Sequence, residues 1–99
     1  MKTLAELREM VTEEERLTVE YEVETNLDSD GGIYFYDLSE AYEYLSSVLR
    51  EQTDTDLFEC EDFKKIDYVQ LALHFENIDK ETVKLASYRR RSDTEFIEE

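Results

Sequence analysis

Residues 17–37, LTVEYEVETNLDSDGGIYFYD, have the pattern of two β-strands joined by a turn. In the first strand, apolar residues alternate with polar ones, and three of the polar positions are Glu20, Glu22 and Glu24. Successive side chains of a strand point to opposite faces of a sheet, so the apolar set can be buried while the glutamates face water. The second strand, residues 33–36, alternates in the same way and places Tyr34 and Tyr36 on one face. The stretch therefore predicts a hairpin with an acidic, tyrosine-bearing outer side.

Apolar periodicity predicts helices and strands on both sides of this hairpin. A helix over residues 4–14 begins with the capping-box pattern Thr3-x-x-Glu6. A second helix begins after Asp37 and carries an apolar stripe that includes Leu45, with Tyr44 on its polar side. Further strands are expected at residues 68–75 and 82–88, where inward-facing apolar residues occur at every second position, with a turn at residues 77–80.

Two segments have less decisive patterns. Residues 52–65 suit either an acidic loop or a short helix that begins near Asp56, and residues 89–99 are expected to fray or to form a short helix around Phe96 and Ile97. The element order is then α-β-β-α-β-β. We expect an α+β fold with one domain over residues 1–99, in which a four-stranded antiparallel sheet is covered by helices on one face.

The charge of the chain limits its partners. It has 27 acidic and 11 basic residues, a net charge of −16, and the part up to residue 63 holds 19 of the acids but 4 of the bases. Such a chain should repel nucleic acid and anionic membranes and attract cationic proteins, of which nucleic-acid-binding proteins are the largest group. An acidic surface that serves only solubility is the alternative. One cysteine, Cys60, suits a reducing compartment, and we expect a cytoplasmic protein, either a monomer or a homodimer.

The turn of the hairpin resembles an EF-hand calcium loop. Six residues occupy positions 1, 3, 5, 6, 8 and 12 of that template: Asn26, Asp28, Asp30, Gly31, Ile33 and Asp37. The match departs from the family at position 1, which is Asn, and at position 12, which is the shorter Asp. A strand pattern also precedes the loop where the family has a helix. A hairpin turn with a Gly-Gly pair is the other interpretation, and we expect no metal and no cofactor.

Catalytic motifs are sparse. Cys60 lies between two glutamates, which disfavour a reactive thiolate, and His74 falls on the outward face of its predicted strand. No phosphate-binding loop or zinc-type spacing is present. The sequence therefore predicts a protein that is not an enzyme.

The predicted function is a non-enzymatic inhibitor that blocks the cationic groove of a nucleic-acid-binding protein. In size and composition the chain resembles small acidic DNA-mimic proteins of phages and mobile elements, including anti-CRISPR and antirestriction proteins. Carboxylates at regular strand spacing can bind the Lys and Arg groups that otherwise hold phosphates, and tyrosines anchor interfaces. The predicted partner-binding residues are Glu20, Glu22, Glu24, Asp28, Asp30, Tyr34 and Tyr36. The alternatives are an immunity protein or antitoxin that neutralises a nuclease toxin, or a calcium-binding module at residues 26–37.

Overall fold

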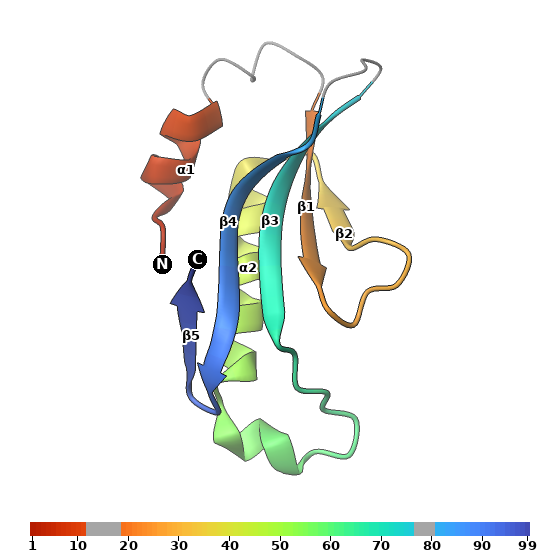
Figure 1. The fold of residues 1–99 in the computed structure, drawn as a ribbon, viewed down its shortest axis with the longest axis vertical. Coiled ribbons are helices and arrows are strands. Elements are labelled where there is room, and N and C mark those ends of the chain that lie inside the picture. Colours follow the sequence, from red (N-terminus) through yellow and green to blue (C-terminus); the bar gives the residue numbers. More distant parts are fainter. Residues whose placement is uncertain (12–18, 77–80) are drawn as a thin grey trace.

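A computed structural model describes residues 1–11, 19–76 and 81–99. In these residues the elements follow one another as α1 (Leu4–Val11), β1 (Val19–Thr25), β2 (Ile33–Phe35), α2 (Leu38–Gln52), a 3₁₀ turn (Thr55–Glu59), β3 (Tyr68–Phe75), β4 (Val83–Ser92) and β5 (Glu95–Glu98). The strands form one antiparallel sheet in the order β2-β1-β3-β4-β5 (Figure 1). The end of the first predicted helix at residue 14 and the turn predicted at residues 77–80 lie outside the described residues.

Both helices begin where the sequence predicts. The Thr3 hydroxyl accepts a hydrogen bond from the Glu6 amide at 3.1 Å, and the Glu6 carboxylate accepts one from the Thr3 amide at 3.2 Å. This is the reciprocal capping box, which satisfies two amides that the first turn of a helix leaves free. At the start of α2, the Asp37 carboxylate accepts from the Ser39 amide at 2.7 Å.

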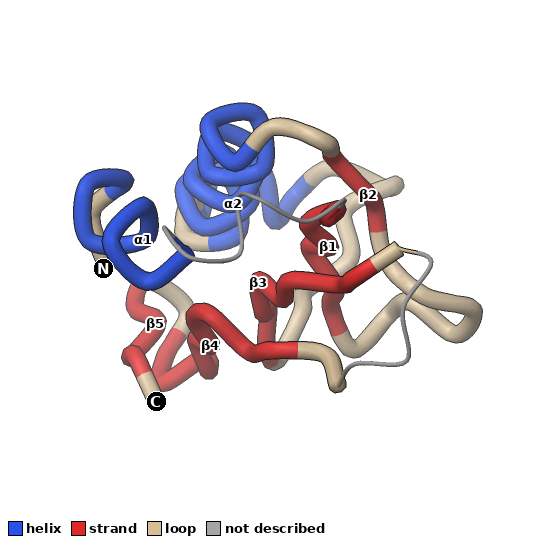
Figure 2. The backbone as a smooth tube through the Cα atoms, turned by 90° about the horizontal axis from the view of Figure 1, so that it is seen from above, coloured by secondary structure: helices blue, strands red, loops and turns tan. Residues whose placement is uncertain are grey.

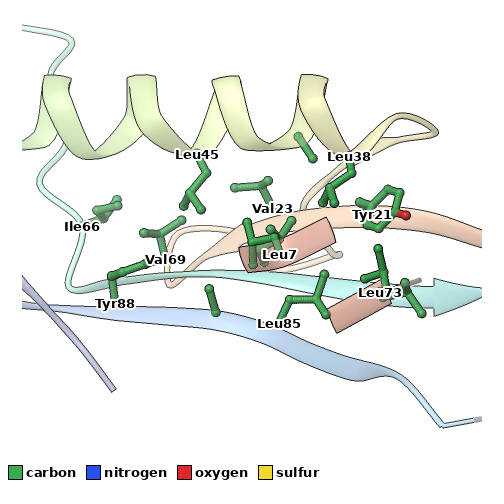
Figure 3. Close-up of a cluster of buried hydrophobic side chains, with 14 residues drawn as sticks. Leu7, Tyr21, Val23, Leu38, Leu45, Ile66, Val69, Leu73, Leu85 and Tyr88 are labelled. Atoms are coloured by element: carbon green, nitrogen blue, oxygen red, sulfur yellow. The ribbon is translucent and has the colours of Figure 1, made fainter. Parts of the chain in front are cut away.

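The helices lie together on one face of the sheet, as expected, and the core fills the space between them (Figure 2). Leu7 and Val11 bury their side chains from α1, and Leu38, Ala41 and Leu45 do so from α2. Figure 3 shows Leu38 and Leu45 directed from α2 toward Val23, Val69 and other apolar side chains of the sheet. The apolar stripe of α2 therefore forms the central contact of the fold.

The sheet has five strands in the described residues, so the prediction of four strands was wrong. The C-terminal segment forms β5 instead of a short helix, and it pairs with the end of β4 from Tyr88 to Ser92. Phe96 packs beneath the guanidinium of Arg90, whose Cζ lies 4.7 Å from the ring centroid. This tertiary contact holds a four-residue segment in strand conformation whatever its local preference.

A β-bulge changes which side chains of β4 are buried. The pairing of β3 with β4 shifts between Leu71 and Ala72. Leu85 and Ala86, which are neighbours, therefore both join the core, and Tyr88 follows them there with 2% of its surface exposed. Simple alternation from Leu85 would have placed Ser87 inward and Tyr88 outward.

One residue of α2 was assigned to the wrong side. Tyr44 was expected to face water but is half-buried and packs against the core, with its ring centroid 5.5 Å from that of Phe35. The reason is that β2 extends the sheet beneath this side of the helix. The uncertain segment after α2 contains the 3₁₀ turn, which begins after Asp54, close to the predicted start. No helix in the described part of the chain has the length and apolarity needed to cross a membrane.

Candidate partner-binding face

The outer side of β1 carries the predicted glutamates. This strand lies between β2 and β3, so each glutamate has neighbours on one or both sides. Glu20 is opposite His74 on β3, and Glu22 is opposite Tyr34 on β2. The alternation within β1 therefore places the glutamates on one face, as predicted, but the neighbouring strands determine how far each one reaches water.

Glu22 is buried, and the expectation that all three glutamates face water was wrong for this residue. Its side chain is 6% exposed. One carboxylate oxygen accepts a hydrogen bond from the Gly32 amide at 2.7 Å, and the other lies 2.7 Å from Nε2 of His74. The turn of the hairpin folds over the carboxylate, and strand alternation alone does not reveal that coverage.

Hydrogen bonds keep this buried carboxylate charged. Burial alone would raise the pKa of Glu22, but the bonds from the Gly32 amide, His74 and Tyr34 together lower it below the usual value. The second ring nitrogen of His74, Nδ1, lies 3.1 Å from the Thr82 hydroxyl. His74 thus connects the carboxylate on β1 to the residue just before β4. It lies on the outward face of β3, as predicted, with its side chain 27% exposed.

The other carboxylates of the face remain accessible and crowd one another. Glu20 and Glu24 are half-exposed, and Asp28 is exposed at the turn, where it accepts a hydrogen bond from the Thr25 amide at 2.8 Å. Burial and then the negative charge of Glu22 raise the pKa of Glu24, and Asp28 adds to this repulsion. Within the described residues, no lysine or arginine forms an ion pair with these carboxylates. Among the residues whose positions are described, lysine and arginine therefore do not neutralise this negative charge.

Tyr34 lies among these carboxylates. Burial raises the pKa of its phenol, and the charges of Glu22, Glu20 and Glu24 raise it further. The residue is nevertheless 47% exposed, with its ring 5.5 Å from that of His74. Five of the seven predicted partner-binding residues thus come together on one face.

The other two predicted residues lie apart from this group. Asp30 is exposed in the turn, and Tyr36 is 76% exposed beyond the end of β2. Two exposed apolar residues of the hairpin, Leu27 and Ile33, were not among the predicted contacts. Ile33 shares a face with Phe35, but it lies at the outer end of an edge strand. The edge position of β2 follows from the strand order of the complete sheet, so the local sequence pattern could not predict it.

Three of the oxygen-bearing side chains of the calcium-like loop already have partners within the protein. Asn26 accepts a hydrogen bond from the Asp67 amide at 2.7 Å, Asp28 accepts from Thr25, and Asp37 caps α2. In the segments that the structure covers, no group of three or more His, Cys, Asp or Glu side chains is arranged to hold a metal ion. The loop is built as a turn between strands, with Gly31 at a φ of 99°.

No protein-family model matches this chain, and no curated protein or solved structure is significantly similar to it.

Proposed function

We propose that this protein is a non-enzymatic inhibitor that uses the outer face of its first hairpin to occupy the cationic groove of a nucleic-acid-binding protein. This is the mode of action of DNA mimics, the class that includes anti-CRISPR and antirestriction proteins. The observation that supports it is the grouping of Glu20 and Glu24 near the exposed ring of Tyr34, with Asp28 beside Glu24 and no ion pair from these carboxylates to a described lysine or arginine. These groups supply charge and an aromatic anchor at one place.

The physical basis is the strength of hydrogen bonds between ions. A carboxylate binds lysine and arginine through the same short, charge-assisted contacts that a phosphate does. Glu20 and Glu24 are four residues apart on one strand, a distance of roughly 13 Å at about 3.3 Å per residue. A cationic groove that holds a nucleic-acid backbone presents several such donors along its length, so it can engage both carboxylates together.

Glu22 has a different role in this proposal. Its oxygens are occupied by Gly32 and His74, so it does not contact the partner. Instead it fixes the turn of the hairpin against β1 and β3. A surface that is rigid before binding loses less conformational entropy on association, which improves affinity.

The test is a binding assay against purified cationic proteins: a guide-loaded CRISPR nuclease, a restriction enzyme and a nuclease toxin. We expect one of them to bind the protein in competition with DNA, with an affinity that falls steeply as salt rises. Glu20→Lys combined with Glu24→Lys should weaken that binding by a factor of about a hundred or more, because each reversal removes a charge-assisted contact of about 1.5 kcal/mol or more.

The matched control is Glu40→Lys combined with Glu43→Lys. These two residues are exposed on α2, which lies on the opposite side of the sheet. If the control pair weakens binding as much as the hairpin pair, only net charge matters and the face is not the binding site. If this chain competes with DNA for none of the three proteins, the inhibitor proposal fails for these partner classes.

A further inference from the structure

A cavity lies where the last turns of α2 meet the C-terminal strands, beside β5, which forms the edge of the sheet opposite β2. Its volume is about 310 Å³, at the small end of the range for ligand pockets, which is about 300–1,000 Å³. Its lining comes from three elements and the start of the chain: Leu49 and Arg50 on α2, Thr53 at the C-cap of that helix, Tyr88 on β4, Phe96 and Glu98 on β5, and Met1. Most of this lining is aliphatic or aromatic.

The polar groups of the lining already have partners, with one exception. The Tyr88 hydroxyl donates to the Glu98 carboxylate at 3.2 Å, and that carboxylate also lies 3.3 Å from the ammonium of Lys2. The Thr53 hydroxyl donates to the Leu49 carbonyl at 2.8 Å. The guanidinium of Arg50 forms no hydrogen bond or ion pair with any described residue.

Arg50 therefore brings an uncompensated positive charge to an apolar cavity in a chain of net charge −16. Because Lys2 already balances Glu98, the charge of Arg50 is available to a ligand. We propose that this cavity binds a small aromatic carboxylate, with the carboxylate on Arg50 and the ring against Tyr88 and Phe96. An arginine binds a carboxylate through two parallel hydrogen bonds, and aromatic rings pack favourably against one another.

Size and charge restrict the ligand to this class. A cavity near the lower limit of ligand pockets has room for one small molecule. A single arginine beside Glu98 favours one negative charge, since a second would be repelled by that carboxylate and by the acidic chain as a whole. A cationic ligand would be repelled by the positive charge of Arg50. The site is separate from the hairpin face and does not depend on the proposed inhibitory function.

The experiment is an NMR titration of the full-length protein with 2-naphthoate, and with 2-naphthamide as a neutral probe of the same shape. We expect 2-naphthoate to shift the amide signals of Leu49, Thr53 and Phe96 saturably, and the amide probe to bind more weakly. Arg50→Gln should weaken 2-naphthoate binding about tenfold, the value of one charge-assisted contact. The control is Lys84→Gln, which removes one positive charge, as Arg50→Gln does, but at an exposed residue that does not line the cavity. It should change the Kd for 2-naphthoate by no more than about twofold.

Three results would overturn the proposal. One is equal binding of the two probes, which would mean that Arg50 does not select for charge. Another is an equal loss of affinity in Arg50→Gln and Lys84→Gln, which would mean that only net charge acts. The third is the absence of saturable shifts at the cavity at millimolar 2-naphthoate. Because Arg50 is exposed and without partners among the described residues, its replacement should leave the fold intact, which the amide spectrum checks directly.

Discussion

Replacing Glu22 with alanine tests whether the outer face of the sheet depends on its buried carboxylate. The wild-type side chain holds the Gly32 amide at one oxygen and His74 at the other, each at 2.7 Å. A hydrogen bond to a charged group contributes about 1.5–3 kcal/mol. Since the carboxylate is 6% exposed, water screens it little. Loss of both bonds should therefore lower the free energy of unfolding by at least about 3 kcal/mol, within the range for breaking a buried charged pair.

The assay is urea denaturation at pH 7, compared with Glu20→Ala on the same strand. Glu20 is half-exposed, and its carboxylate forms no hydrogen bond with the side chains that the structure describes. Its replacement should therefore lower the free energy of unfolding by about 0.5 kcal/mol or less. The m-value should be the same in all three proteins, so the difference in midpoint reports stability alone. Equal costs for the two alanine variants would refute the claim that Glu22 holds the hairpin turn in place.

Other replacements test the remaining contacts by the same denaturation assay. Leu45→Ala should cost about 2–5 kcal/mol, because its side chain is fully buried, and a cost below 1 kcal/mol would mean that α2 packs differently. Gly32→Ala should cost about 3 kcal/mol, since an added Cβ would lie 2.2 Å from a backbone oxygen of β1, and a neutral result would contradict this close approach. Arg90→Lys should cost about 1.5–3 kcal/mol, because one ammonium cannot replace both the bond from Nε to the Ile66 carbonyl and the bonds from Nη2 to Gln52, and an unchanged midpoint would contradict that role. The pKa of Glu22 is lower in the folded protein than its ordinary value of 4.5, so its ionisation stabilises the fold at pH values above 4.5. This stabilisation is lost as the pH falls through the folded pKa. Stability should therefore fall less between about pH 5 and pH 3 in Glu22→Gln than in the wild type.

Local sequence patterns predicted the elements whose signals are contained within one segment. The α2 helix has a capping aspartate, a regular apolar stripe and fifteen residues, so its start and its buried face agree with expectation. Strands β1 and β3 alternate cleanly, and each one was found where the alternation placed it. In these cases the apolar side chains that enter the core follow from the period of their own segment.

The features that the sequence did not predict depend on contacts between distant segments. β5 is a strand because β4 extends alongside it and Arg90 covers Phe96. The bulge in β4 reverses the alternation after Leu85, and no glycine marks it. The same limit applies to the candidate face. The acidic row on β1 was predictable, but the burial of Glu22 requires both the hairpin turn and His74, which is 52 positions away.

The position of β1 between β2 and β3 also has a consequence for how the chain folds. β1 pairs with β2 across a short turn, but its pairing with β3 joins Val19 to Phe75 and Thr25 to Val69, with α2 and the 3₁₀ turn between them. Closing so long a loop costs entropy before any contact of that pair forms. The hairpins β1–β2 and β3–β4 can form early, because their partners are close in sequence. The step that joins them creates the β1–β3 pair and completes the surface on which α2 packs, and we expect that step to limit the folding rate.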